Sequence, residues 1–195
     1  SNVRSTMAHW HIWDVVYVVI LFFADSLWLE KAHPFERQFT INDITISHPF
    51  TKHERVPGGV LVSWSMFLPP VVIVIMVLLF IPIKYKFYVI YIANLSYYTA
   101  IFTTVMLTDV LKNWIGRCRP DFLARCKPLP SAVPDVLYFA KDICSTYDPN
   151  GHGWGALMDG FITTPSGHSS MAFTLGGFLS LFLLSQLNAF KPKYS

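Results

Sequence analysis

Long runs of apolar residues, separated by polar stretches, are the main pattern along this chain. Three runs of more than 20 residues contain no charged residue, and a fourth run is apolar apart from Asp14 and Asp25. Because a helix needs about 20 apolar residues to cross a bilayer, each run predicts a membrane-spanning helix. The four expected spans lie near residues 12–29, 60–83, 87–111 and 170–190.

The composition agrees with a membrane protein. Of the 195 residues, 53% are hydrophobic and 14% are charged, whereas ordinary soluble domains contain about 25% charged residues. So apolar a chain buries or partitions its surface and is not disordered. The net charge of +3 is too small to suggest a nucleic-acid partner. We therefore predict an all-α fold, an integral membrane helical bundle that forms a single domain over 1–195.

Two long polar loops, 30–59 and 112–169, connect the expected spans on one side. The short segments on the other side carry basic residues without neighbouring acids, namely Arg4, Lys84, Lys86, Lys191 and Lys193. Short basic segments stay in the cytoplasm, and long loops count less toward orientation. A raw count of Lys and Arg favours the loop side by ten to five, but the loops also carry acids. We expect both termini in the cytoplasm and both long loops on the non-cytoplasmic face.

The second long loop begins with two cations at helical spacing. Lys112 and Arg119 are seven residues apart, so two helical turns would bring them to one face. Pro120 predicts that the helix ends near Arg119. The planar guanidinium of Arg and the point charge of Lys together suit the oxygens of a phosphoryl group. The alternative is that these are interfacial cations at the end of a membrane helix.

The same loop ends with a segment suited to an anion. Ser166 would lie at or near the N-cap of the fourth helix, whose first backbone N–H groups would be free to bind an anion. Gly167 lets a ligand approach the backbone closely. His168 would lie beside the bound anion and could donate a proton near neutral pH. The alternative is a capped helix with a surface histidine.

Together the two elements resemble the type 2 phosphatidic acid phosphatase superfamily. The matching patterns are Lys-x6-Arg-Pro at 112–120 and Pro-Ser-Gly-His at 165–168, with supporting similarity at 116–126 and 159–161. The resemblance is greatest to the lipid phosphate phosphatase branch. The first loop, with Asp43 and His48-Pro49, resembles the fungal diacylglycerol pyrophosphate phosphatases within that branch.

The resemblance implies dephosphorylation of lipid phosphates at the non-cytoplasmic face, with phosphatidate, lysophosphatidate or diacylglycerol pyrophosphate as substrate. It implies that His168 is the general acid, and that the phosphate is bound by Lys112, Arg119, Ser166 and Gly167. Positive side chains then replace a metal ion, so neither metal nor cofactor is expected. The implied partners are a phospholipid and the bilayer of an endomembrane or the plasma membrane, and a homo-oligomer stays open. The loop with the site would be lumenal or extracellular.

One part of the family pattern has no counterpart among these 195 residues. The family's third motif, Ser-Arg-x5-His-x3-Asp, carries the nucleophilic histidine beyond a fifth span, and this pattern does not occur here. His152 has no arginine at the required spacing. We therefore expect a truncated domain, about two thirds of the family's six-helix bundle. A covalent route needs its nucleophile, so this chain alone should hydrolyse little or no lipid phosphate.

Two alternatives to a phosphatase stay open at this point. A shortened, noncatalytic member of the family could act as a membrane interaction protein by associating with an intact copy. The superfamily also includes vanadium haloperoxidases, which hold vanadate in the same site. Those relatives lack four hydrophobic spans, which weighs against the second alternative.

Smaller features add four expectations. Three cysteines are too few for a disulfide scaffold, but a disulfide between Cys126 and Cys144 is permitted in a non-cytoplasmic loop. Cys118 is expected to pack inside the first motif. Asp109 is expected to form a structural salt bridge with Lys112 along the helix. The prolines at 69–70 predict a kink in the second span, which neighbouring helices must accommodate.

Overall fold

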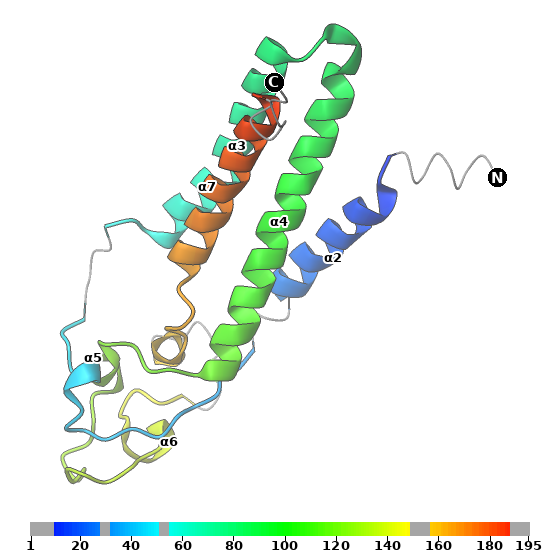
Figure 1. Ribbon diagram of the computed structural model, residues 1–195. Coiled ribbons are helices and arrows are strands. Elements are labelled where there is room, and N and C mark those ends of the chain that lie inside the picture. The colour runs from blue at the N-terminus through cyan, green and yellow to red at the C-terminus, as the bar shows by residue number, and fades with distance from the viewer. Residues whose placement is uncertain (1–9, 28–31, 51–54, 149–156, 188–195) are drawn as a thin grey trace, which may run out of the picture. The chain divides into compact units, whose positions relative to one another are not determined.

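The computed structural model describes residues 10–27, 32–50, 55–148 and 157–187. Four long helices dominate this part of the chain: α2 (Ile12–Leu27), α3 (Gly58–Phe80), α4 (Lys86–Ile115) and α7 (Gly167–Gln186) (Figure 1). The short helices are η2 (Ile44–Ile46), η3 (Ile83–Tyr85), α5 (Phe122–Cys126), α6 (Ala140–Ile143) and η4 (Met158–Phe161). The described ranges contain isolated β-bridges but no strand. The predicted all-α fold is confirmed.

Among the described residues, three helical segments are long and apolar enough to cross a membrane. They cover Gly58–Phe80, Ile83–Ile115 and Gly167–Gln186, with mean hydropathies of 2.4, 1.3 and 1.3. The first of the four expected spans is α2, whose described part has 16 residues, fewer than the roughly 20 that a span needs. Residues 28–31 lie outside the described part, and so do Arg4, His152, Lys191 and Lys193. The first span and the orientation of the chain therefore stay predictions.

The chain divides into two compact units. The membrane unit consists of Ser1–Phe22, Val56–Val105 and His168–Ser195, and the loop unit consists of Phe23–Arg55 and Met106–Gly167. The membrane unit therefore holds most of the long apolar helices. The loop unit collects the two long polar connections that the sequence predicts.

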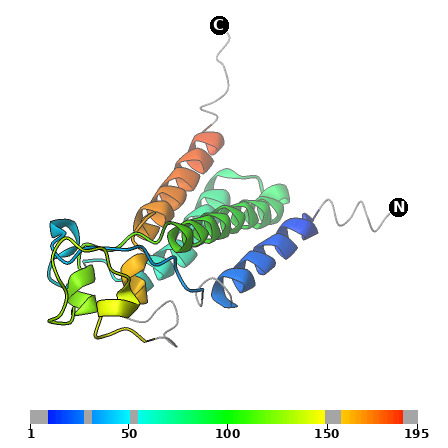
Figure 2. The same cartoon turned by 90° about the horizontal axis from the view of Figure 1, so that it is seen from below.

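Within the membrane unit, α4 contacts the three other long helices (Figure 2). The buried core of the membrane unit consists of Ile73, Val77, Ala93, Tyr97, Ile101 and Met171. Large apolar side chains on the outer faces are exposed, and Phe67, Leu79 and Phe173 are each at least 70% exposed. Exposed apolar patches of this extent indicate contact with a membrane or another protein surface. A helix with an apolar surface all round is typical of a membrane span.

Helix α3 continues through Pro69 and Pro70, and two tyrosines of α4 bind the carbonyl groups that these prolines leave without a donor. Because proline has no N–H, the carbonyls four residues earlier, those of Ser65 and Met66, lose their helical hydrogen bonds. The hydroxyl of Tyr97 donates to the Ser65 carbonyl at 2.6 Å, and that of Tyr98 donates to the Met66 carbonyl at 3.1 Å. The neighbouring helix thus accommodates the two prolines, as such sites in a bilayer require.

Replacing Tyr97 by Phe is expected to lower the free energy of unfolding by about 1 kcal/mol. The fully buried Tyr97 ring would remain, while the Ser65 carbonyl would lose its donor. The measurement is an unfolding titration in mixed micelles, followed by circular dichroism. Tyr85→Phe is the matched control because, among the described residues, the Tyr85 hydroxyl has no hydrogen-bond partner. Equal losses in the two variants would contradict the role of the Tyr97 hydroxyl.

The loop unit has a hydrophobic core of its own. The Phe122 ring is fully buried and contacts Phe39 and Phe161, with ring centroids 4.8 and 4.7 Å apart. Cys126 and Cys144 form the disulfide that the sequence permits. Phe39 and Tyr138 pair in an isolated β-bridge. These contacts join the first long loop, α5 and η4 into one packed body.

Candidate functional site

The first motif begins on α4 and continues beyond the end of this helix. Lys112 lies in the last turn of α4, where its Nζ is 3.1 Å from Oδ1 of Asp109. The expected salt bridge between these residues is therefore confirmed. Helix α4 ends at Ile115. The expectation that it runs to about Arg119, with Lys112 and Arg119 on one helical face, is wrong.

Gly116 explains where α4 ends. Its φ is +56°, a conformation that favours glycine. A Cβ atom at this position would lie 1.8 Å from the carbonyl oxygen of Phe35. The segment of Phe35 is itself attached to α4, because its N–H donates to the Asn113 carbonyl at 2.8 Å. The first long loop thus crosses the end of α4, and the chain leaves the helix four residues before Pro120.

The second motif lies at the start of α7. The helix begins at Gly167, and Ser166 directly precedes it, which is the position expected of an N-cap. His168 is the second residue of α7, and its Nε2 is 2.9 Å from the Val56 carbonyl oxygen. A carbonyl oxygen only accepts hydrogen bonds, so this contact requires the proton on Nε2 of His168. The imidazole is therefore held as a donor.

The two motifs meet at Lys112 and Gly167 in the loop unit. A Cβ atom on Gly167 would lie 3.1 Å from Nζ of Lys112. The ammonium group thus lies against the first residue of α7, where glycine leaves room for it.

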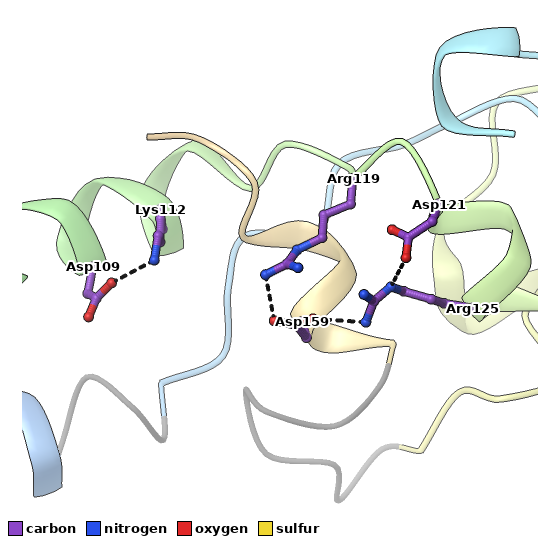
Figure 3. A network of polar contacts seen from close by, with 6 residues as sticks. All are labelled: Asp109, Lys112, Arg119, Asp121, Arg125 and Asp159. Atoms are coloured by element: carbon purple, nitrogen blue, oxygen red, sulfur yellow. Dashed lines mark hydrogen bonds and ion pairs between the residues drawn. The ribbon is translucent and has the colours of Figure 1, made fainter. Parts of the chain in front are cut away.

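Arg119 lies on a non-helical segment and belongs to a network of charged side chains (Figure 3). Its Nη2 is 2.8 Å from Oδ1 of Asp159, and Nη1 of Arg125 is 2.8 Å from Oδ2 of the same carboxylate. Asp121 completes the network, with Oδ2 3.0 Å from Nε of Arg125. Figure 3 shows the Lys112 and Arg119 side chains pointing to the same side of the chain, each toward a carboxylate.

One donor of Arg119 lacks an acceptor in the part of the chain that the structure describes. The Nε atom of Arg119 is buried and has no hydrogen-bond partner within the described residues. Buried polar groups are normally hydrogen-bonded, so each exception calls for an explanation such as a missing ligand or water. An oxyanion next to this guanidinium would supply the missing acceptor.

Sequence reasoning gave no role to Asp159, Arg125 and Asp121. The spacing of Asp121 and Arg125, four residues apart, could have predicted their ion pair on a short helix. Asp159 is 40 and 34 residues from its two arginine partners, and no local pattern connects them. The carboxylate at the centre of the network was therefore not predictable from spacing.

Cys118 lies within the first motif and packs against the core of the loop unit, as predicted. Burial raises the pKa of its thiol to about 11. The thiol therefore stays protonated at neutral pH and is a poor nucleophile. Within the described ranges, no three His, Cys, Asp or Glu side chains form a group that could hold a metal ion. Metal independence itself stays a prediction.

The fold and the motif geometry define a class of protein: a helical membrane protein in which a lysine of the first motif lies against a glycine of the second. The sequence model of the PAP2 superfamily matches residues 93–193, more than half of the chain. This chain therefore belongs to the PAP2 superfamily.

Several named proteins are similar over more than four fifths of the chain. Diacylglycerol pyrophosphate phosphatase 1 of Saccharomyces cerevisiae is 40% identical over 185 residues, which are 95% of this chain and 62% of the relative. A probable diacylglycerol pyrophosphate phosphatase 1 of Schizosaccharomyces pombe is 39% identical, over 83% of this chain and 55% of the relative. Lipid phosphate phosphatase 1 of Arabidopsis thaliana is 30% identical, over 96% of this chain and 53% of the relative. The chain thus spans little more than half of their length. No solved structure matches it.

Proposed function

We propose that this chain forms the phosphate-binding part of a metal-independent lipid phosphate phosphatase. Its substrate class is lipids with a terminal phosphate, including phosphatidate, lysophosphatidate and diacylglycerol pyrophosphate. The observation that carries the proposal is the approach of the Lys112 ammonium to Gly167, which brings the two motifs together. Similarity to two fungal proteins named for diacylglycerol pyrophosphate supports the substrate class. The two long loops would face the lumen or the cell exterior.

Each residue has a role in this proposal. Lys112 and Arg119 bind the phosphate oxygens. One of the donors is the Arg119 Nε, which has no acceptor among the described residues. Ser166 and Gly167 add contacts from the start of α7, where backbone N–H groups favour negative charge. The cations stabilise the charge that develops during phosphoryl transfer, which is the main task in such a reaction. His168 protonates the departing lipid oxygen as general acid.

We further propose that these 195 residues alone hydrolyse lipid phosphate slowly or not at all. No residue of this chain matches the histidine nucleophile of the family's third motif. Loss of a nucleophile lowers turnover by several orders of magnitude in other hydrolases. The activity of the chain alone is measured as phosphate release from dioctanoyl phosphatidate by the purified chain in nanodiscs. Appreciable release that disappears in His168→Ala would refute the proposed inactivity and support His168 as the acid.

The variant Gly167→Ala tests whether the proposed site binds phosphate. Its Cβ would lie 3.1 Å from Nζ of Lys112, so the ammonium must shift by a few tenths of an ångström. Because charged hydrogen bonds depend on geometry, we expect weaker binding of inorganic phosphate and unchanged thermal stability. Phosphate binding to the chain in micelles is followed by 31P NMR line broadening.

Gly176→Ala is the matched control for this test. Gly176 lies on the same helix, and a Cβ there has no atom within 4 Å. We expect wild-type phosphate affinity in this variant. If the wild-type chain binds no phosphate, or if the two variants bind it equally, the proposed phosphate site is wrong. A noncatalytic interaction protein would then be the better description.

A further inference from the structure

We propose that Asp159 is a positioning residue that fixes the Arg119 guanidinium for phosphate and is itself held by Arg125. This inference rests on the proposed function, because it assigns Arg119 to the phosphate. Asp159 divides its two oxygens between the two arginines, with Oδ1 on Arg119 and Oδ2 on Arg125, each at 2.8 Å. A carboxylate held at both oxygens cannot rotate without losing a charged hydrogen bond.

The backbone supports the same attachment. The N–H of Arg119 donates to the carbonyl of Gly160 at 2.7 Å, directly beside Asp159. Side chain and main chain therefore join residue 119 to the turn at 159–160 at two points. Gly160 also fits closely, since a Cβ there would lie 2.8 Å from the Phe122 ring. η4, which carries Asp159, is thus packed directly on α5.

Arg125 is a rigid anchor for this carboxylate. Its side chain is only 10% exposed, and Asp121 holds its Nε at 3.0 Å. The Phe50 ring faces its guanidinium, with the ring centroid 4.8 Å away. Arg125 lies on α5 beside Cys126, whose disulfide with Cys144 ties this helix to a second segment of the loop unit. Arg125 is therefore held by an ion pair and a ring contact, and its helix is held by a disulfide.

Two effects of the Asp159 carboxylate on phosphate binding have opposite signs. Its negative charge repels phosphate, so its removal alone would strengthen binding. Its hydrogen bond orients Arg119, which is still 29% exposed and would otherwise sample many rotamers, so its removal alone would weaken binding. Because solvent screens the repulsion near the surface, we expect orientation to outweigh repulsion.

The first experiment measures inorganic phosphate binding to the whole chain in micelles. Asp159→Asn keeps the size of the side chain and removes its charge, and we expect about tenfold weaker binding, comparable to loss of a supporting residue behind a metal ligand. Asp135→Asn is the charge-matched control, because Asp135 lies in the same unit and binds the Asn42 amide at 2.6 Å. It should stay within about twofold of wild type. Unchanged or stronger binding in Asp159→Asn would overturn the proposal.

A second variant separates charge from geometry and carries the test if Asp159→Asn does not fold. Asp159→Glu keeps the negative charge but moves the carboxylate by one methylene group. A positioning role predicts weaker phosphate binding in this variant as well. A purely electrostatic role predicts wild-type affinity, and that result would contradict the inference.

Arginine labelling shows whether the contact itself breaks. Phenylglyoxal reacts with guanidinium groups, and peptide mass spectrometry reports each arginine separately. We expect Asp159→Asn to raise the labelling rate of Arg119 relative to Arg55, while Asp121→Asn raises that of Arg125 alone. If the labelling rate of Arg119 is unchanged in Asp159→Asn, the proposed positioning of Arg119 by Asp159 is wrong.

Added phosphate distinguishes failure of this inference from failure of the proposed function. If phosphate does not protect Arg119 in the wild-type chain, the proposed function is wrong and the inference falls with it. If phosphate protects Arg119 equally well in wild type and Asp159→Asn, only the inference is wrong. Protection that needs about ten times more phosphate in Asp159→Asn supports both, at the size expected for a supporting residue.

Discussion

Gly116→Ala is expected to lower the free energy of unfolding by about 3 kcal/mol or more. The backbone at this position has φ +56°, which costs a residue with a Cβ about 1–2 kcal/mol. The new Cβ would also lie 1.8 Å from the Phe35 carbonyl oxygen. Phe35 cannot move away freely, because its N–H is bound to Asn113 at 2.8 Å. The backbone strain at residue 116 and the displacement of Phe35 therefore both lower the free energy of unfolding.

An unfolding titration in mixed micelles measures this effect. Gly59→Ala and Gly176→Ala are the controls, because a Cβ at either position meets no atom within 4 Å. Both glycines lie in helices, where alanine is favoured by up to about 1 kcal/mol, so the controls should equal or exceed the wild type. A Gly116→Ala variant within about 1 kcal/mol of wild type would contradict the packing of Phe35 over the end of α4.

Removal of the disulfide is the second large effect. Cys126 and Cys144 are 18 residues apart, and a cross-link over a loop of this length contributes about 3 kcal/mol, chiefly by restricting the unfolded chain. The double variant Cys126→Ala/Cys144→Ala should lose about that much stability. Pulse proteolysis of cleavage sites in the loop unit reports the unfolding of this unit rather than of the apolar helices.

Reductant provides the control for this prediction. Dithiothreitol should destabilise the wild-type chain and Cys118→Ala to the same extent, because Cys118 is not part of the disulfide. The double variant should not respond to reductant. A wild-type loop unit that resists proteolysis equally well with and without reductant would show that the disulfide adds little to the packed core around Phe122.

The apolar runs were sufficient to predict the long helices, because a chain in a bilayer must satisfy its backbone within each segment. The start of α7 was also predictable, since Ser166 and Gly167 have the chemistry of a helix N-terminus. The end of α4 was not. Pro120 is a general signal for a helix end, but Gly116 ends α4 earlier because Phe35, 81 residues before it in the chain, occupies the space beside it.

The candidate site was predictable in part. The resemblance to a family named its motif residues, and the approach of Lys112 to Gly167 agrees with their proposed association. The expected helical face shared by Lys112 and Arg119 failed, because spacing along a helix has no meaning once the helix has ended. Asp159 joins arginines far from it in sequence, so only the folded loop unit reveals its position.

The pairing of two prolines with two tyrosines fixes how α3 and α4 are aligned along their axes. A slide of one helical turn, about 5.4 Å, would carry the Tyr97 and Tyr98 hydroxyls away from the carbonyls of Ser65 and Met66. Both carbonyls would then lose their donors, at a cost of about 1 kcal/mol each. Apolar side chains alone would tolerate such sliding much better. The two prolines, through these hydrogen bonds, thus determine the axial position of α4 relative to α3 in the bilayer.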